Sequence, residues 1–199
     1  MKKVVIIGGG FAGALAAKKL QNHFNVTLID TKDYFEFTPG VLRTIVKPQH
    51  AKMIEVLHKN YLKNGKVIIG EVIDVSSKNV SLKIRGKKKQ VRFDYLAITS
   101  GSRYESPMKE KNLIVSGRTK IFSKIYKKVC SAKNILIIGG GIVGTELAAE
   151  IATHYKGKNL TIVHSKPYLM ERQNEKAREY AESFLKKRGV KFIFNERVV

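Results

Sequence analysis

The sequence is poor in cysteine and in long apolar runs. Cys130 is the single cysteine among 199 residues, so the chain has neither an internal disulfide framework nor a Cys-x-x-Cys redox pair. A dithiol relay within this chain is therefore excluded. No apolar run reaches the roughly 20 residues that a transmembrane helix needs.

Acidic residues are also scarce. The chain has 38 Lys and Arg against 16 Asp and Glu, which gives a formal net charge of +22. Such a charge is compatible with nucleic acid or an anionic membrane surface. However, the lysines are scattered, the one tight basic run at Lys87-Lys88-Lys89 fits a hairpin tip, and the interleaved aromatic and basic residues that stack bases are missing. We therefore expect no specific nucleic-acid partner and attribute the charge to a lysine-rich composition.

Glycine, by contrast, is concentrated in two copies of one pattern. Gly8-Gly9-Gly10-Phe11-Ala12-Gly13 and Gly139-Gly140-Gly141-Ile142-Val143-Gly144 both have the form G-x-G-x-x-G. Each follows a short apolar run and opens a stretch compatible with a helix, which is the context of a dinucleotide-binding turn. Two such turns, 131 residues apart, predict a duplicated unit and two dinucleotides handled by one protein.

The Lys2-Lys3 start and the apolar residues after it superficially resemble a secretory signal. Three consecutive glycines interrupt that region and a strand ending in Asp30 follows, which the dinucleotide interpretation explains and the signal interpretation does not. We expect a cytoplasmic protein, and peripheral association with a membrane stays open.

The pattern predicts an α/β protein with two Rossmann-like βαβ units and parallel sheets, the first unit interrupted by a small antiparallel β-meander. The expected domains are 1–105, with the meander at about 66–93, and 106–199. Expected strands are 2–7, 26–29, 66–75, 80–85, 90–93, 95–99, 135–138, 160–163 and 191–194. Expected helices are 11–23, 41–46, 50–64, 119–130, 142–155 and 174–188.

In the first unit, each glycine of the turn has a separate expected role. Gly8 permits the tight turn, Gly10 leaves room for a pyrophosphate, and Gly13 allows close packing of helix and strand. The phosphates are then expected at the N-terminus of the helix. Asp30 ends the second strand, where its carboxylate can accept hydrogen bonds from ribose hydroxyls.

The second unit has the same glycines but no acidic residue at the position that corresponds to Asp30. His164, Ser165 and Lys166 stand at the corresponding strand end, so nothing there repels a ribose 2′-phosphate, and NADPH as well as NADH is compatible. Two interpretations stay open: Lys166 or His164 accepts such a phosphate, or these residues face solvent.

Glu146, on one helical face with Glu150, either borders the nicotinamide as a catalytic residue or complements the helix dipole.

Taken together, these motifs resemble the pyridine-nucleotide oxidoreductases with two dinucleotide-binding domains. The group that looks most similar is the ferroptosis-suppressor, or apoptosis-inducing-factor-homologue, group, with type II NADH dehydrogenases as neighbours. The residues that carry the resemblance are Gly8-x-Gly10-x-x-Gly13, Asp30-x-Lys32-Asp33-x-Phe35, Leu42-Arg43, Thr99-Ser100-Gly101 and Gly139-x-Gly141-x-x-Gly144-x-Glu146-Leu147-Ala148-x-Glu150.

This resemblance implies FAD at the first turn and NADH or NADPH at the second, with hydride passing from nicotinamide to flavin and electrons then passing to a quinone-like acceptor. It implies FAD contacts from Gly8, Gly10, Phe11, Ala12, Gly13, Asp30, Lys32, Arg43 (flavin), Val72 (adenine), Thr99, Ser100 and Gly101. It implies NAD(P)H contacts from Gly139, Gly141, Ile142, Val143, Gly144 and His164.

Members of the resembled group continue beyond the segment that matches this chain. They have more of the NAD domain, a second FAD segment and a C-terminal interface domain. We therefore expect a truncated or split chain. The alternative to the oxidoreductase is a non-catalytic nucleotide-binding protein that keeps the glycine turns and lacks those segments.

Overall fold

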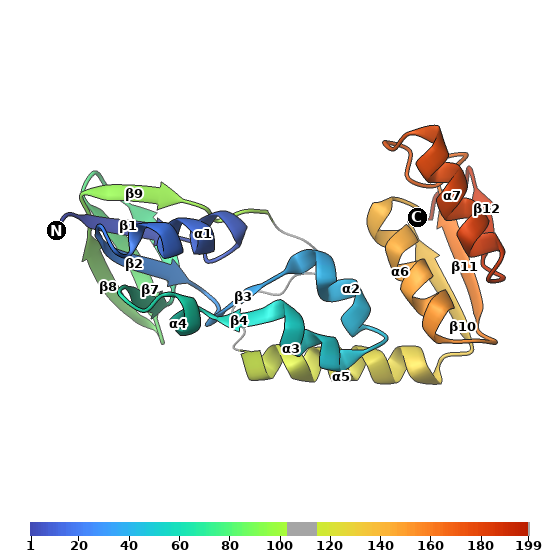
Figure 1. The fold of residues 1–199 in the computed structure, drawn as a ribbon, viewed down its shortest axis with the longest axis horizontal. Helices are drawn as coiled ribbons and strands as arrows, with labels where there is room; N and C mark the ends of the chain where they lie inside the picture. The colour runs from blue at the N-terminus through green and yellow to red at the C-terminus, as the bar shows by residue number, and fades with distance from the viewer. Residues whose placement is uncertain (103–114, 199) are drawn as a thin grey trace. The chain divides into compact units, whose positions relative to one another are not determined.

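The computed structural model describes residues 1–102 and 115–198. They belong to two compact units, of which unit 1 comprises Met1–Pro39 and Ala51–Ile121, and unit 2 comprises Gly40–His50 and Phe122–Val199. Each contains a parallel sheet and helices (Figure 1), so the predicted α/β class with two Rossmann-like units is confirmed. The division into domains near residue 105 stays a prediction.

Unit 1 is built on a four-stranded parallel sheet whose order is β5-β2-β1-β9. Alternate side chains of β1 face opposite sides of it. Val4 and Ile6 join the core that includes Ala17 of α1, whereas Val5 joins the core formed with the meander. Both faces are covered, which is why these strands read as continuous apolar runs. The elements are β1 (Lys3–Ile7), α1 (Phe11–Leu20), β2 (Asn25–Asp30), β5 (Lys66–Ile69) and β9 (Tyr95–Ile98).

The predicted meander is present as the antiparallel strands β6 (Glu71–Val75), β7 (Asn79–Ile84) and β8 (Lys87–Arg92). Its predicted first strand, 66–75, is wrong as a single element, because the chain breaks at Gly70 and β5 joins the parallel sheet instead. A Cβ on Gly70 would lie 3.0 Å from the Lys83 carbonyl oxygen, so glycine allows the close approach. The turn of the last hairpin lies at Arg85 and Gly86, ahead of the lysine run.

The predicted helix over 50–64 is also wrong. This segment contains two single-turn helices, α3 (Ala51–Ile54) and α4 (His58–Tyr61), separated by β4 (Glu55–Leu57). β4 pairs antiparallel with β3 (Tyr34–Glu36), with Phe35 opposite Val56. Pairing with a strand about 20 residues earlier therefore outweighs the local helical pattern. A 3₁₀ turn, Thr38–Gly40, follows β3.

Unit 2 has a three-stranded parallel sheet in the order β10-β11-β12. Its core brings Ile137, Ile151, Ile162 and Leu185 together with Val46. The predicted elements of this region are confirmed: β10 (Asn134–Ile138), α6 (Ile142–His154), β11 (Asn159–His164), α7 (Glu175–Lys186) and β12 (Lys191–Phe194). The unit also includes α2 (Val41–Thr44) and the 3₁₀ turn Pro48–His50, and helix α5 (Val115–Ser131) continues into it from unit 1.

Candidate functional site

The two glycine turns have the same backbone geometry. Gly8 and Gly139 have φ angles of +97° and +103°, a region that favours glycine. Each donates its amide hydrogen across the sheet over 2.8 Å, Gly8 to the Ile29 carbonyl oxygen and Gly139 to that of Val163. The repeat read from the sequence is therefore a repeat of conformation.

The last glycine of each turn packs against the first. A Cβ on Gly13 would collide with the carbonyl oxygen of Gly8, and a Cβ on Gly144 would collide with that of Gly139. Helix and strand approach each other this closely only because no side chain stands between them. These contacts are the close packing of helix and strand that the last glycine of each motif is expected to allow.

The middle glycine of each motif is open, in contrast. A Cβ on Gly10 or Gly141 would meet no atom within 4 Å. Both residues are exposed N-caps, and the helices that they begin, α1 and α6, have no side-chain cap and no acid in the first turn. Uncapped amides beside an open glycine fit the pyrophosphate of a dinucleotide.

The side chains predicted to border the two cofactors are exposed at these helix starts. They are Phe11, Ala12, Ile142 and Val143. The Phe11 ring meets Phe35 and Phe37 edge-on, with centroids 5.2 and 5.6 Å apart. An aromatic surface of unit 1 thus lies next to the first glycine turn.

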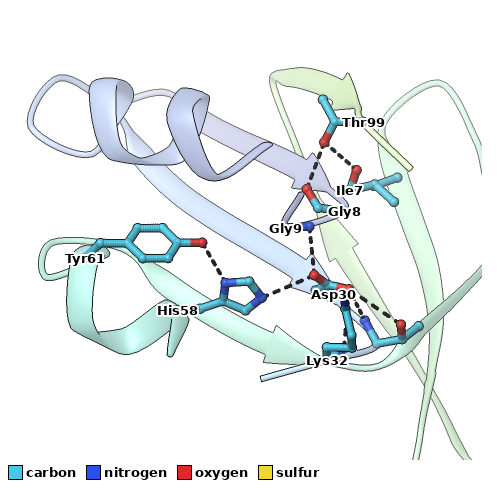
Figure 2. Close-up of polar contacts among 9 residues, drawn as sticks. Ile7, Gly8, Gly9, Asp30, Lys32, His58, Tyr61 and Thr99 are labelled. Atoms are coloured by element: carbon cyan, nitrogen blue, oxygen red, sulfur yellow. Dashed lines mark hydrogen bonds and ion pairs between the residues drawn. The ribbon is translucent and has the colours of Figure 1, made fainter. Parts of the chain in front are cut away.

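Thr99 supports the first turn through its side chain. Its hydroxyl lies 2.8 Å from the carbonyl oxygens of both Ile7 and Gly8 (Figure 2), and its amide donates to Ile7. Ser100 and Gly101 follow it and are exposed. Thr99 therefore shapes the turn from inside the unit, while its two neighbours are the accessible residues of the predicted Thr-Ser-Gly motif.

Asp30 lies at the end of β2, as predicted, with an environment that the sequence did not reveal. Its Oδ2 accepts a hydrogen bond from the Gly9 amide (2.9 Å) and lies 3.2 Å from His58 Nε2. His58 Nδ1 in turn lies 2.6 Å from the Tyr61 hydroxyl (Figure 2). His58 and Tyr61 were missed, because no motif or spacing connects them with Asp30.

Two further predicted FAD residues lie near the ends of strands in unit 1. The Lys32 amide lies 3.3 Å from Asp30 Oδ1, and its ammonium group stands over the Tyr34 ring, 5.0 Å from the centroid. Val72 is half-buried and packs against the core shared by the sheet and the meander. Its contact with adenine stays a prediction.

Arg43 and the two predicted glutamates lie in unit 2. Arg43 forms an ion pair with Glu150, in which Nη2 and Nε each lie 3.0 Å from Oε1. Partial burial and the charge of Glu150 raise the pKa of the neighbouring Glu146. Glu146 lies in the second turn of α6, beyond the first-turn position in which an acid best complements the dipole.

His164 is the last residue of β11, as Asp30 is the last residue of β2. Its ring packs against Gly140, since a Cβ there would lie 2.9 Å from His164 Cδ2. Among the described residues, its buried Nε2 has no hydrogen-bond partner. An unpaired buried nitrogen carries a free-energy cost, and the contact of His164 with NAD(P)H stays a prediction.

Over residues 1–102 and 115–198, no helix is long and apolar enough to cross a membrane. The same residues contain no group of three or more His, Cys, Asp or Glu side chains that could hold a metal ion.

A family model described as pyridine nucleotide-disulphide oxidoreductase matches residues 2–199. Apoptosis-inducing factor homolog A of Dictyostelium discoideum is 40% identical over 207 residues, which cover 99% of this chain and 50% of that protein. Ferroptosis suppressor protein 1 of Xenopus tropicalis is 32% identical, covering 98% of this chain and 53% of that protein. The resemblance inferred from the motifs is confirmed, and the chain spans about half the length of these curated relatives.

The fold is also similar to that of a solved structure. The solved structure of NDH2 from Plasmodium falciparum in complex with NADH superposes with a TM-score of 0.80 at 20% identity, covering 100% of this chain and 48% of that one. At that identity the similarity shows the fold alone.

Proposed function

Because the chain belongs to the pyridine nucleotide-disulphide oxidoreductase family, we propose that it carries the nucleotide-binding part of an NAD(P)H oxidoreductase. Members of this family bind FAD together with NADH or NADPH, in line with the predicted cofactors. In the proposal, the glycine turn of unit 1 holds FAD and that of unit 2 holds the nicotinamide nucleotide. The supporting observation is the repeated turn with its open Gly10 and Gly141.

When bound, FAD supplies hydride acceptance and onward electron transfer. The amides of Gly10, Phe11 and Ala12 would bind its pyrophosphate through the uncapped start of α1. Asp30 would bind ribose hydroxyls of its adenosine part. At the second turn, Gly141, Ile142 and Val143 would act likewise on the nicotinamide nucleotide, with His164 near its adenosine ribose.

A quinone-like electron acceptor is part of the same proposal, and the resemblance to the ferroptosis-suppressor group supports it. With Cys130 as its single cysteine, this chain cannot run a dithiol relay of its own, so flavin is the proposed redox centre. Glu146 is proposed to border the nicotinamide, and peripheral membrane association is proposed on the resemblance alone.

The absorbance spectrum of the purified protein tests this function directly. After incubation with FAD and removal of free flavin, we expect a flavin spectrum that bleaches when NADH or NADPH is added without oxygen, and that returns with a soluble quinone. A protein that retains FAD without bleaching would be a nucleotide-binding protein that lacks the reaction. A protein that retains no flavin would contradict FAD binding by unit 1.

A further inference from the structure

Unit 1 contains a hydrogen-bonded chain of three side chains, Tyr61, His58 and Asp30, with His58 fully buried and Tyr61 partly buried. His58 is 0% exposed and Asp30 is 10% exposed. The Tyr61 hydroxyl lies 2.6 Å from His58 Nδ1, and His58 Nε2 lies 3.2 Å from Asp30 Oδ2 (Figure 2). The Tyr–His pair belongs to α4, so a separate element of unit 1 holds the acid that ends β2.

The chemistry of the three groups sets the direction of these hydrogen bonds. Burial by itself raises the pKa of Asp30, but the hydrogen bond and electrostatic attraction from His58, followed by the charge of Lys32, outweigh it, and the net pKa lies below the ordinary value. An ionised carboxylate only accepts, so His58 Nε2 carries a hydrogen. If the imidazole is neutral, Nδ1 accepts from the Tyr61 hydroxyl, and if it is protonated, Nδ1 donates to the Tyr61 oxygen.

Five donors around Asp30 divide between its two oxygens. Oδ2 receives Gly9 and His58, whereas Oδ1 lies 2.6 Å from the Thr31 amide, 3.3 Å from the Lys32 amide and 3.5 Å from the Thr31 hydroxyl. A carboxylate has about four lone-pair sites, so a ribose hydroxyl must replace or share one donor. The Thr31 hydroxyl and the Lys32 amide are the two most distant of the five, and both lie on Oδ1, so Oδ1 is the side on which a ribose hydroxyl is most easily accepted.

Gly9 is shaped by the same chain of contacts. A Cβ at this position would collide with His58 Cε1 and would lie 2.5 Å from Asp30 Oδ2. The x position of the first G-x-G-x-x-G is therefore glycine because the His58 ring lies against it. In unit 2 the ring of His164 itself packs against the corresponding Gly140, so the arrangement of acid and supporting histidine is particular to the first turn.

From these contacts we infer that His58 is a positioning residue of the first dinucleotide site. With Tyr61 behind it, His58 holds Asp30 Oδ2 against the glycine turn, and so presents Oδ1 to the ribose hydroxyls of the adenosine part of FAD. The inference rests on the proposed binding of FAD by unit 1.

The test is FAD affinity, measured through quenching of flavin fluorescence, for variants of the full chain. His58→Leu removes the hydrogen bond to a charged acceptor, and we expect its FAD dissociation constant to rise by about 10- to 100-fold. His58→Gln can place an amide N–H near Asp30 and is expected to restore most of the affinity. Tyr61→Phe should give an intermediate loss, and His23→Leu, at an exposed histidine of unit 1, should give none.

A double-mutant cycle separates positioning from general loss of structure. If His58 acts through Asp30, adding His58→Leu to Asp30→Asn will weaken FAD binding little beyond Asp30→Asn alone. Circular dichroism and melting temperature follow folding in each variant, and His58→Gln covers the case in which His58→Leu does not fold.

Different results would overturn FAD binding by unit 1 and the positioning role of His58. If the unaltered protein retains no FAD, the proposed function and this inference are both overturned. If it binds FAD and His58→Gln and His58→Leu bind equally weakly, or the effects of positions 30 and 58 simply add, only the inference is overturned.

Discussion

Glu36 and Glu55 lie directly opposite each other in the antiparallel pair of β3 and β4. Arg118 binds Glu36 through two nitrogens at 2.8 and 3.2 Å, with both side chains buried. Glu55 Oε1 is buried and, within the described parts of the chain, has no hydrogen-bond partner. Burial, followed by the charge of Glu36, raises the pKa of Glu55 to about 7.

This arrangement predicts that Glu55 makes unit 1 less stable as the pH rises. The folded form holds the Glu55 proton more tightly than the unfolded form, so the free energy of unfolding falls between about pH 4.5 and pH 7 and then levels off. Glu55→Gln keeps the shape without the charge. It should raise the free energy of unfolding at pH 8 by about 1–2 kcal/mol, after a discount for partial exposure, and change it little at pH 4.

Urea denaturation at the two pH values measures this difference. The matched control is Glu71→Gln, at an exposed glutamate of β6, which should alter stability equally little at both. A gain from Glu55→Gln that is the same at pH 4 and pH 8 would contradict a raised pKa as its cause.

We expect a substitution at either open glycine, Gly10 or Gly141, to weaken nucleotide binding and to change stability little. Gly10 has φ −73°, and a Cβ on it would meet no protein atom, so Gly10→Ala should cost only the difference between two N-cap residues, below about 1 kcal/mol. The methyl group would instead occupy the space expected for the FAD pyrophosphate. We expect FAD affinity to fall by about tenfold or more, as measured by flavin fluorescence.

Two further variants complete that comparison. Gly141→Ala should weaken NADH binding and leave FAD binding unchanged, since it alters the other turn. Gly13→Ala would force a Cβ into the Gly8 carbonyl and should lower the melting temperature markedly. FAD binding undiminished by Gly10→Ala would mean that the pyrophosphate does not lie at this turn.

The glycine turns were predictable because each requirement is local. A positive φ at Gly8 and the close approach at Gly13 depend on residues within one strand–turn–helix segment, and the covered strands show as unbroken apolar runs. Asp30 was placed at the end of β2 for the same reason.

The partners of Asp30 and Arg43 could not be predicted from a local sequence pattern. His58 reaches Asp30 because β4 interrupts what reads as one helix over 50–64, and that interruption depends on pairing with β3. Likewise, Arg43 meets Glu150 across 107 residues of sequence. Neither partner has a spacing or motif that marks it.

The ion pair of Arg43 and Glu150 provides a test of the predicted flavin contact of Arg43. The Arg43 side chain is 53% exposed, so the pair should contribute less than about 1 kcal/mol to stability. Arg43→Ala and Glu150→Gln should therefore unfold within about 1 kcal/mol of the unaltered protein. If Arg43 also contacts flavin, only Arg43→Ala will weaken FAD binding, whereas equal FAD affinities in both variants would assign Arg43 to the ion pair alone.

The strand end at His164 predicts which nicotinamide nucleotide unit 2 accepts. His164→Asp would place a carboxylate where β2 has Asp30, and its charge should repel a ribose 2′-phosphate. We expect the ratio of the NADPH and NADH dissociation constants to rise by about tenfold, measured by quenching of nucleotide fluorescence. His164→Asn changes the shape without the charge, and Lys176→Gln changes the net charge by the same amount at an exposed site on α7. Because the two nucleotides differ only in the phosphate, a ratio that is the same in all four proteins would mean that the phosphate does not lie near residue 164.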